Sequence, residues 1–173
     1  MTTAQKKLLA AAQAEIGYLE KASRSQLDDK TANAGSGNWT KYARDLDNLG
    51  DVFNGKKNGY DWCAVFATWC FVQTFGKATG QALLCQPAKS LAAGVKYAAN
   101  YFKNKGQFHT SGPQPGDQIF FYGSTIDVWQ HTGLVERVEG GKAESTNYMW
   151  EDVLTREQMV TILYRFAQMM GRA

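Results

Sequence analysis

The segment from Trp62 to Phe75, WCAVFATWCFVQTF, constrains the fold more than any other part of the chain. Its apolar residues cover every side of a helix, and such a helix is stable only when the rest of a domain encloses it. The segment is shorter than the roughly 18 apolar residues that a membrane span needs. It is therefore predicted to be the central helix of a globular core.

Length and composition support a single globular domain. The 173 residues are 44% hydrophobic and 20% charged, which argues against a disordered chain or a coiled coil. A net charge of +3 is too small to indicate a nucleic-acid-binding protein, although it weakly favours an anionic surface such as a bacterial wall. Neither a nucleic-acid partner nor insertion into a membrane is expected.

The order of the predicted elements indicates an α+β fold. Helices are expected at 2–16, where Thr2 and Gln5 form a capping box, and at 38–49, 62–75 and 88–104, with a polar loop at 21–38. Strands are expected at 118–122, at 129–138 and after the Glu-Gly-Gly turn that follows. Because helices and antiparallel strands are segregated along the chain, the class is α+β.

Cys63 is the first candidate for chemistry. Asp61 is a good N-cap residue, which would place Cys63 in the first turn of the buried helix, where the helix dipole and free N–H groups lower a thiol pKa. The carboxylate of Asp61 opposes this effect. The alternative is that Cys63 is a small buried hydrophobic residue, as we expect for Cys70 and Cys85. Three cysteines do not suit a disulfide framework.

His131 is the candidate base. It lies in a predicted strand about 70 residues after the cysteine, and a helix-start cysteine followed by a strand histidine is a known arrangement for nucleophilic catalysis. His109 lies in the loop QFHTSGPQPGD and is expected to be exposed. The two residues Cys63 and His131 thus form the core of a predicted catalytic site.

Three blocks of sequence resemble a known family. WCAVFATWCF, QPGDQIFF and HTGLVERVEGGK are similar to the successive motifs of the CHAP superfamily of papain-like, NlpC-type cysteine peptidases and amidases, which cut bacterial peptidoglycan. EIGYLEK and NWTKYARDLD resemble phage endolysins that carry this domain. The resemblance implies N-terminal helices packed on a small antiparallel sheet. It also implies a hydrolase in which Cys63 is the nucleophile and His131 the base.

The implied reaction is cleavage of a peptidoglycan amide bond through a cysteine thioester. An N-acetylmuramoyl-L-alanine amidase and a peptide endopeptidase would use the same residues, so the bond that is cut stays open. The alternative is a non-catalytic wall-binding or structural protein whose CHAP site has decayed. This second reading is suggested by Asp61 beside the thiol and by the altered end of the third motif, KAESTNYMW.

Two residues are candidates for orienting the histidine, Asn147 and Glu144. If Glu139, Gly140 and Gly141 form a three-residue loop, Val138 pairs with Lys142 and Asn147 lies opposite Gly133, on the face of His131.

The same count places Glu144 opposite Glu136, on the other face and roughly 16 Å along the strand from His131. Asn147 is therefore the predicted orienter, as in Cys-His-Asn sites.

Three further features leave alternatives open. Trp62 and Trp129 are interpreted either as walls of a substrate groove or as core residues. Asp45, Asp47 and Asp51 do not fit the EF-hand spacing, but calcium remains possible because some CHAP enzymes bind it. No other cofactor is expected.

The organisation predicts a catalytic domain at 1–149 and a C-terminal helical segment at 150–173. Within this tail, VLTREQMVTILYRFAQMMG resembles part of an S-layer homology repeat and is expected to dock on the core rather than to anchor the protein to the wall. No export signal is recognised at the N-terminus. We expect synthesis in a bacterial cytoplasm and action on the wall after holin-type release, with the oligomeric state open.

Overall fold

The computed structural model describes residues 1–123, 128–139 and 142–145. Within these ranges five helices precede a three-stranded sheet, which confirms the predicted α+β class. The elements are α1 (Thr3–Gln13), α2 (Lys41–Leu49), α3 (Cys63–Phe75), α4 (Lys77–Leu83), α5 (Val95–Asn104), β1 (Gln118–Gly123), β2 (Val128–Glu139) and β3 (Lys142–Ser145).

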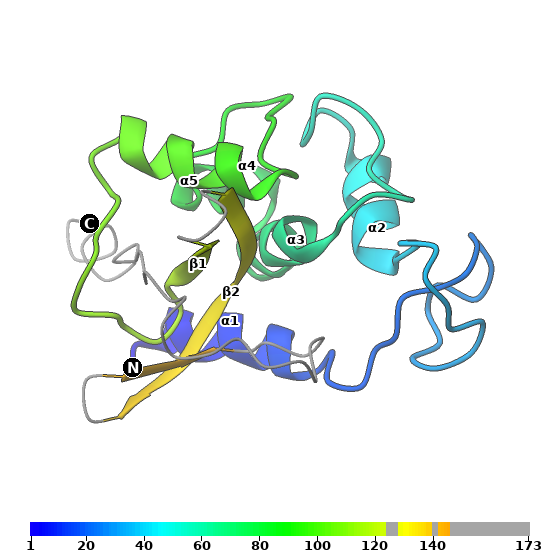
Figure 1. Ribbon diagram of the computed structural model, residues 1–173, viewed down its shortest axis with the longest axis horizontal. Helices are drawn as coiled ribbons and strands as arrows, with labels where there is room; N and C mark the ends of the chain where they lie inside the picture. Colours follow the sequence, from blue (N-terminus) through cyan, green and yellow to red (C-terminus); the bar gives the residue numbers. More distant parts are fainter. Residues whose placement is uncertain (124–127, 140–141, 146–173) are drawn as a thin grey trace.

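Helix α3 lies at the centre of the molecule, as its sequence predicts. Every residue from Ala64 to Val72 is buried, and the helix is surrounded by the sheet and the other helices (Figure 1). One hydrophobic core joins α3 to Leu8 of α1, Phe102 of α5 and Leu134 of β2. The N-terminal helix therefore packs in the same core as the sheet.

The predicted start of α1 is correct and its predicted end is not. The Thr2 hydroxyl accepts from Gln5 N and the Gln5 side chain accepts from Thr2 N, which forms the capping box. The helix ends at Gln13 rather than at residue 16, and Ile16 is 48% exposed. Beyond Gln13 the chain turns away, and the helical spacing of Ile16 no longer places it on the buried face.

The turn before β1 fixes the sheet to the rest of the domain. Gly116 adopts φ +92°, a left-handed conformation that favours glycine, and its N–H donates to Val135 O at 2.8 Å. Asp117 Oδ2 accepts from Gln114 N at 2.8 Å. Val135 N in turn donates to Asp117 O at 2.8 Å. These bonds set the register of β1 on β2, and with it the position of His131.

The helix predicted at 88–104 begins only at Val95, and Leu91, which precedes it, is 42% exposed. The backbone before it is used for long-range bonds, since Ser90 N donates to Val52 O at 3.0 Å. Helix α4 was not predicted. It packs so closely on α3 that a Cβ at Gly80 would lie 2.9 Å from the carbonyl carbon of Phe71.

The register of β2 and β3 differs from the prediction at the turn and agrees with it further along. Glu139 pairs with Lys142 and Val138 with Ala143, so the turn is one residue shorter than predicted. Glu144 therefore pairs with Arg137 rather than with Glu136. A bulge between Val135 and Arg137 then compensates for the short turn, and Val135 pairs with Ser145, as the predicted count requires.

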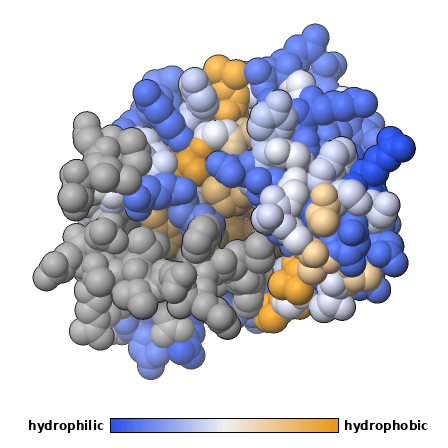
Figure 2. All heavy atoms as spheres, turned by 45° about the vertical axis from the view of Figure 1, so that its right-hand side comes forward, coloured by the Kyte–Doolittle hydropathy of each residue, from blue (hydrophilic) through white to orange (hydrophobic). Residues whose placement is uncertain are grey.

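Asn147 and the predicted C-terminal helix lie outside the described residues. Among the described residues, no helix combines the length and the apolarity that crossing a membrane requires. On the face shown in Figure 2, hydrophilic side chains predominate among the coloured residues and apolar ones form only small separate areas.

Candidate active site

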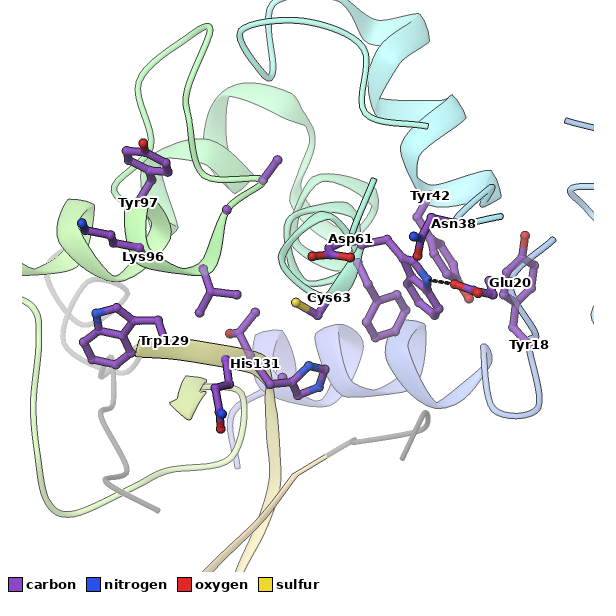
Figure 3. Close-up of a pocket in the computed structure, with 18 of the residues that line it drawn as sticks. Tyr18, Glu20, Asn38, Tyr42, Asp61, Cys63, Lys96, Tyr97, Trp129 and His131 are labelled. Atoms are coloured by element: carbon purple, nitrogen blue, oxygen red, sulfur yellow. Dashed lines mark hydrogen bonds between the residues drawn. The ribbon is translucent and has the colours of Figure 1, made fainter. Parts of the chain in front are cut away.

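A cleft of about 670 Å³ lies where the start of α3 meets β2. Both Cys63 and His131 line it, so the structure brings together the two residues that the sequence singles out. In Figure 3, Cys63 lies near the middle of the cleft, between Asp61 and His131. Residues of the N-terminal segment form one end, and residues of α5 and β2 form the other.

Cys63 is the first residue of α3, but its cap differs from the prediction. The N-cap residue is Trp62, which makes no side-chain capping bond, and Asp61 is an exposed residue before it. The indole Nε1 of Trp62 instead donates to Glu20 Oε2 at 2.9 Å. The first N–H groups of the helix are therefore not occupied by a side-chain cap and face the thiol region.

The pKa of the Cys63 thiol is raised, which contradicts the predicted lowering. Burial is the main cause, and the negative charge of Asp61 adds to it. Hydrogen bonds from the backbone N–H groups of Thr132 and Ala64 act in the opposite direction but do not outweigh burial. The resting thiol is accordingly protonated at neutral pH, and nucleophilic attack by this thiol would require a base that removes its proton.

His131 is a half-buried residue of β2 that pairs with Phe121 of β1, with ring centroids 5.9 Å apart. The next residue, Thr132, hydrogen-bonds the Cys63 sulfur through its backbone, so the strand that carries His131 lies directly against Cys63. This contact fixes β2 to the start of α3 at the point where the two candidate residues lie.

A buried polar network behind β2 was missed by the sequence analysis. The Thr132 hydroxyl donates to Ile119 O at 2.7 Å and accepts from Gln118 Nε2 at 3.0 Å. Thr132 is only 2% exposed and Gln118 only 1%. Since the Thr132 N–H contacts Cys63, this network holds the strand against the thiol. The signal in the sequence was a polar residue at an inward position of each of two neighbouring strands.

The N-terminal end of the cleft was also missed. We call the residues Glu15, Tyr18, Glu20, Asn38 and Tyr42 the N-terminal wall, since all five line the cleft. Its interior is charged: Lys41 Nζ lies 2.7 Å from Glu15 Oε2, and the Tyr42 hydroxyl donates to the same oxygen at 3.0 Å. Burial and this carboxylate together raise the pKa of Tyr42.

The opposite end is built differently. We call four residues the strand wall: Trp129 of β2, and Val95, Lys96 and Tyr97 from the start of α5. Trp129 lines the cleft and also packs on the core, with its ring 6.3 Å from that of Phe120. Trp62 likewise lines the cleft and contacts the core. Each of the two tryptophans therefore both lines the cleft and contacts the core, so the two interpretations do not exclude each other.

The three aspartates considered for calcium have other partners. Asp45 accepts from Trp69 Nε1 and pairs with Arg44, Asp47 accepts from Lys57 N at 3.0 Å, and Asp51 lies 3.6 Å from Lys89 Nζ. Across 1–123, 128–139 and 142–145, no group of three His, Cys, Asp or Glu residues is placed to hold a metal ion. These residues do not fit a calcium loop.

Cys70, Cys85 and His109 are not among the residues that line the cleft. Cys70 is fully buried in α3 and Cys85 is half-buried, and all three cysteines are free thiols. His109 is half-buried and does not line the cleft. Glu144 lies in β3, where its backbone pairs with Arg137.

Comparison with known proteins identifies one family. The family model described as CHAP domain matches residues 55–149, more than half of the 173 residues. No curated protein matches the chain, and no solved structure does. Both Cys63 and His131 lie inside the matched range, and the whole N-terminal wall lies before it.

Proposed function

Because the chain belongs to the CHAP domain family of papain-like peptidoglycan hydrolases, amidases and peptidases, we propose that it cuts a peptidoglycan amide bond with Cys63 as nucleophile. The observation that carries this proposal is the position of Cys63, at the uncapped start of α3, in one cleft with His131. The endolysin-like role, lysis of a bacterial wall, remains part of the proposal.

The raised pKa of Cys63 determines how the reaction begins. His131 takes the thiol proton as sulfur attacks the carbonyl carbon, so no preformed thiolate is needed. The backbone N–H groups of Cys63 and Ala64 are candidates to stabilise the oxyanion. The carbon–nitrogen bond then breaks, and His131 gives its proton to the departing amine. Water, deprotonated by the same ring, hydrolyses the thioester.

Asn147 is the proposed orienter of His131. Support comes from the register at Val135 and Ser145, which agrees with the count that puts Asn147 opposite Gly133. The test compares Asn147→Ala with Glu144→Ala for wall lysis, with circular dichroism to check folding. A partial fall in turnover is expected only for Asn147→Ala. Inactivity of a folded Glu144→Ala protein, with normal Asn147→Ala activity, would reassign the third residue to the carboxylate.

The function itself is tested by lysis of purified bacterial walls. The full chain should clear a wall suspension, and Cys63→Ala should reduce the rate by about three orders of magnitude or more. Cys70→Ala serves as a matched control that should retain activity if it folds. Mass spectrometry of the released fragments then assigns the bond, since an amidase frees the sugar from the peptide and an endopeptidase leaves them joined.

A non-catalytic wall-binding protein is the second candidate function. The raised pKa of Cys63 and the negative charge of Asp61 that contributes to it favour this alternative. Binding of both the full chain and Cys63→Ala to walls, with no fragment released by either, would select it over the enzyme.

A further inference from the structure

We propose that Glu20 and Asp61 are specificity-determining residues that bind a primary ammonium group of the peptidoglycan peptide. This inference rests on the proposed function and names the substrate group that the cleft selects. Both carboxylates line the cleft, and Figure 3 shows Asp61 beside Cys63 and Glu20 further along the cleft, toward Tyr18.

Glu20 is held in position rather than free to reorient. Its Oε2 accepts from Trp62 Nε1 at 2.9 Å, and Trp62 is the residue next to the nucleophile. Its backbone carbonyl accepts from Gly35 N at 3.1 Å. One oxygen of the carboxylate is thus fixed by the indole, and in the described part of the chain no hydrogen bond to the other oxygen is seen, so that oxygen can accept from a ligand.

The loop that carries Glu20 is tightly clamped. Lys21 and Trp39 exchange backbone hydrogen bonds of 2.8 and 3.3 Å. A Cβ at Gly37 would lie 2.5 Å from Ala22 O, so the two strands of the loop are in close contact. Asn38 O accepts from Gly59 N at 3.1 Å, which ties this loop to the segment before Cys63. The distance from Glu20 to the nucleophile is therefore set by the fold.

The described cations nearby are already committed to other partners. Lys21 Nζ donates to Lys30 O, Lys30 Nζ to two backbone carbonyls, Lys41 pairs with Glu15, and Arg44 pairs with Asp28 and Asp45. Within the described ranges, no ion pair involves Glu20 or Asp61. Among the described residues their negative charge is therefore unpaired, and a cationic ligand in the cleft would neutralise it.

The strand wall has the opposite polarity. Its only charged residue is Lys96, which is exposed, and Tyr97 beside it is 47% exposed. A substrate with an ammonium group on one side of the scissile bond and a carboxylate on the other matches this arrangement. The cleft thus fixes the direction in which a peptide lies across Cys63.

Peptides of bacterial walls supply such ammonium groups from two sources. One is the side chain of a diamino acid in the stem, and the other is a free amino terminus. A charged hydrogen bond inside a partly enclosed cleft contributes enough to discriminate roughly tenfold to hundredfold against an acetylated, neutral form.

The test measures kcat/KM of the full chain on three synthetic cross-linked stem peptides. One has both amines free, one is acetylated on the side-chain amine, and one is acetylated at the terminus. We expect at least a tenfold loss for one of the two acetylated forms, which also identifies the source of the ammonium group. In Glu20→Gln, which keeps an oxygen for Trp62, the preference should shrink to within about threefold. Asp51→Asn, an exposed charge outside this cleft, should keep it.

Binding to Cys63→Ala separates recognition from turnover. A preference for the free amine, measured by calorimetry and lost when Glu20→Gln is added, supports the inference even where walls are not lysed. Equal binding and equal cleavage of all three peptides would overturn it even where walls are lysed. Retention of the full preference in Glu20→Gln would overturn the role of this residue.

Discussion

The two walls of the cleft differ in how they are held. The N-terminal wall is fixed by charge and hydrogen bonds, with the Glu15 carboxylate between Lys41 and Tyr42 at its base. The strand wall is fixed by aromatic packing, with the Trp129 ring 4.9 Å from Tyr122 and 6.0 Å from Phe108. Only the second lies within the CHAP match.

This difference indicates that the two walls contribute different properties to the cleft. The matched range supplies Cys63, His131 and Asp61, and the residues before it supply Glu15 and Glu20. The CHAP range is thereby combined with a wall that lies outside the residues the family model matches. We infer that reactivity and selectivity are separable here, and substitutions in one wall should leave the other intact.

The largest effect is expected from breaking the charge network of the N-terminal wall. Lys41→Met leaves Glu15, 8% exposed, without its cation, and an unpaired buried charge costs about 3 kcal/mol. Lys96→Met in the strand wall removes an exposed lysine and should change stability by less than about 0.5 kcal/mol. Urea unfolding of the two variants measures both. Equal stability losses would show that the walls are not held differently.

An intermediate effect is expected at Thr132, which lies between the walls. Thr132→Val leaves Gln118 Nε2 without its acceptor, at a cost of about 1 to 3 kcal/mol. Because the Thr132 backbone contacts the Cys63 sulfur, wall lysis should fall as well. Thr132→Ser keeps the hydroxyl and should restore both properties. A valine variant with unchanged stability and activity would exclude a positioning role.

Much of the fold could be predicted from local patterns. The all-apolar segment gave α3 to within one residue, the capping box gave the start of α1, and the period-two runs gave β1 and β2. The errors arose where tertiary contacts determine the local structure. Residues before Val95 fit a helical pattern, yet their backbone bonds to the segment at 51–54.

The sequence predicted that Cys63 and His131 lie together, but not the electrostatics around them. Residue type and position singled out these two residues, and both line the cleft. The predicted lowering of the Cys63 pKa was wrong, because the burial that raises this pKa depends on the packing of β2 over the thiol. Glu20 was missed because its role depends on Trp62, 42 positions away. The predicted pairing of β2 with β3 was wrong next to the turn, because the sequence spacing does not reveal that a shorter turn is compensated by a bulge.

The smallest effect concerns the charge that Asp61 contributes to the thiol. Its carboxylate raises the pKa of Cys63, so Asp61→Asn should lower that pKa while burial keeps it above the ordinary value. At pH 8, below the thiol pKa, the thiolate fraction and hence the alkylation rate should rise about two- to threefold. Well above the pKa, where the thiol is ionised in both proteins, the rates should converge.

Iodoacetamide labelling from pH 7 to 10, with peptide mapping to separate Cys63 from the half-buried Cys85, measures this shift. Asp51→Asn removes an exposed carboxylate from a different part of the surface and should leave the profile unchanged. Adding the free-amine peptide to the wild-type protein should move the Cys63 profile in the same direction as Asp61→Asn, because the bound ammonium neutralises the same charge. An identical profile with and without the peptide would mean that Asp61 acts on the thiol but not on the substrate, which would leave Glu20 as the selective residue of the N-terminal wall.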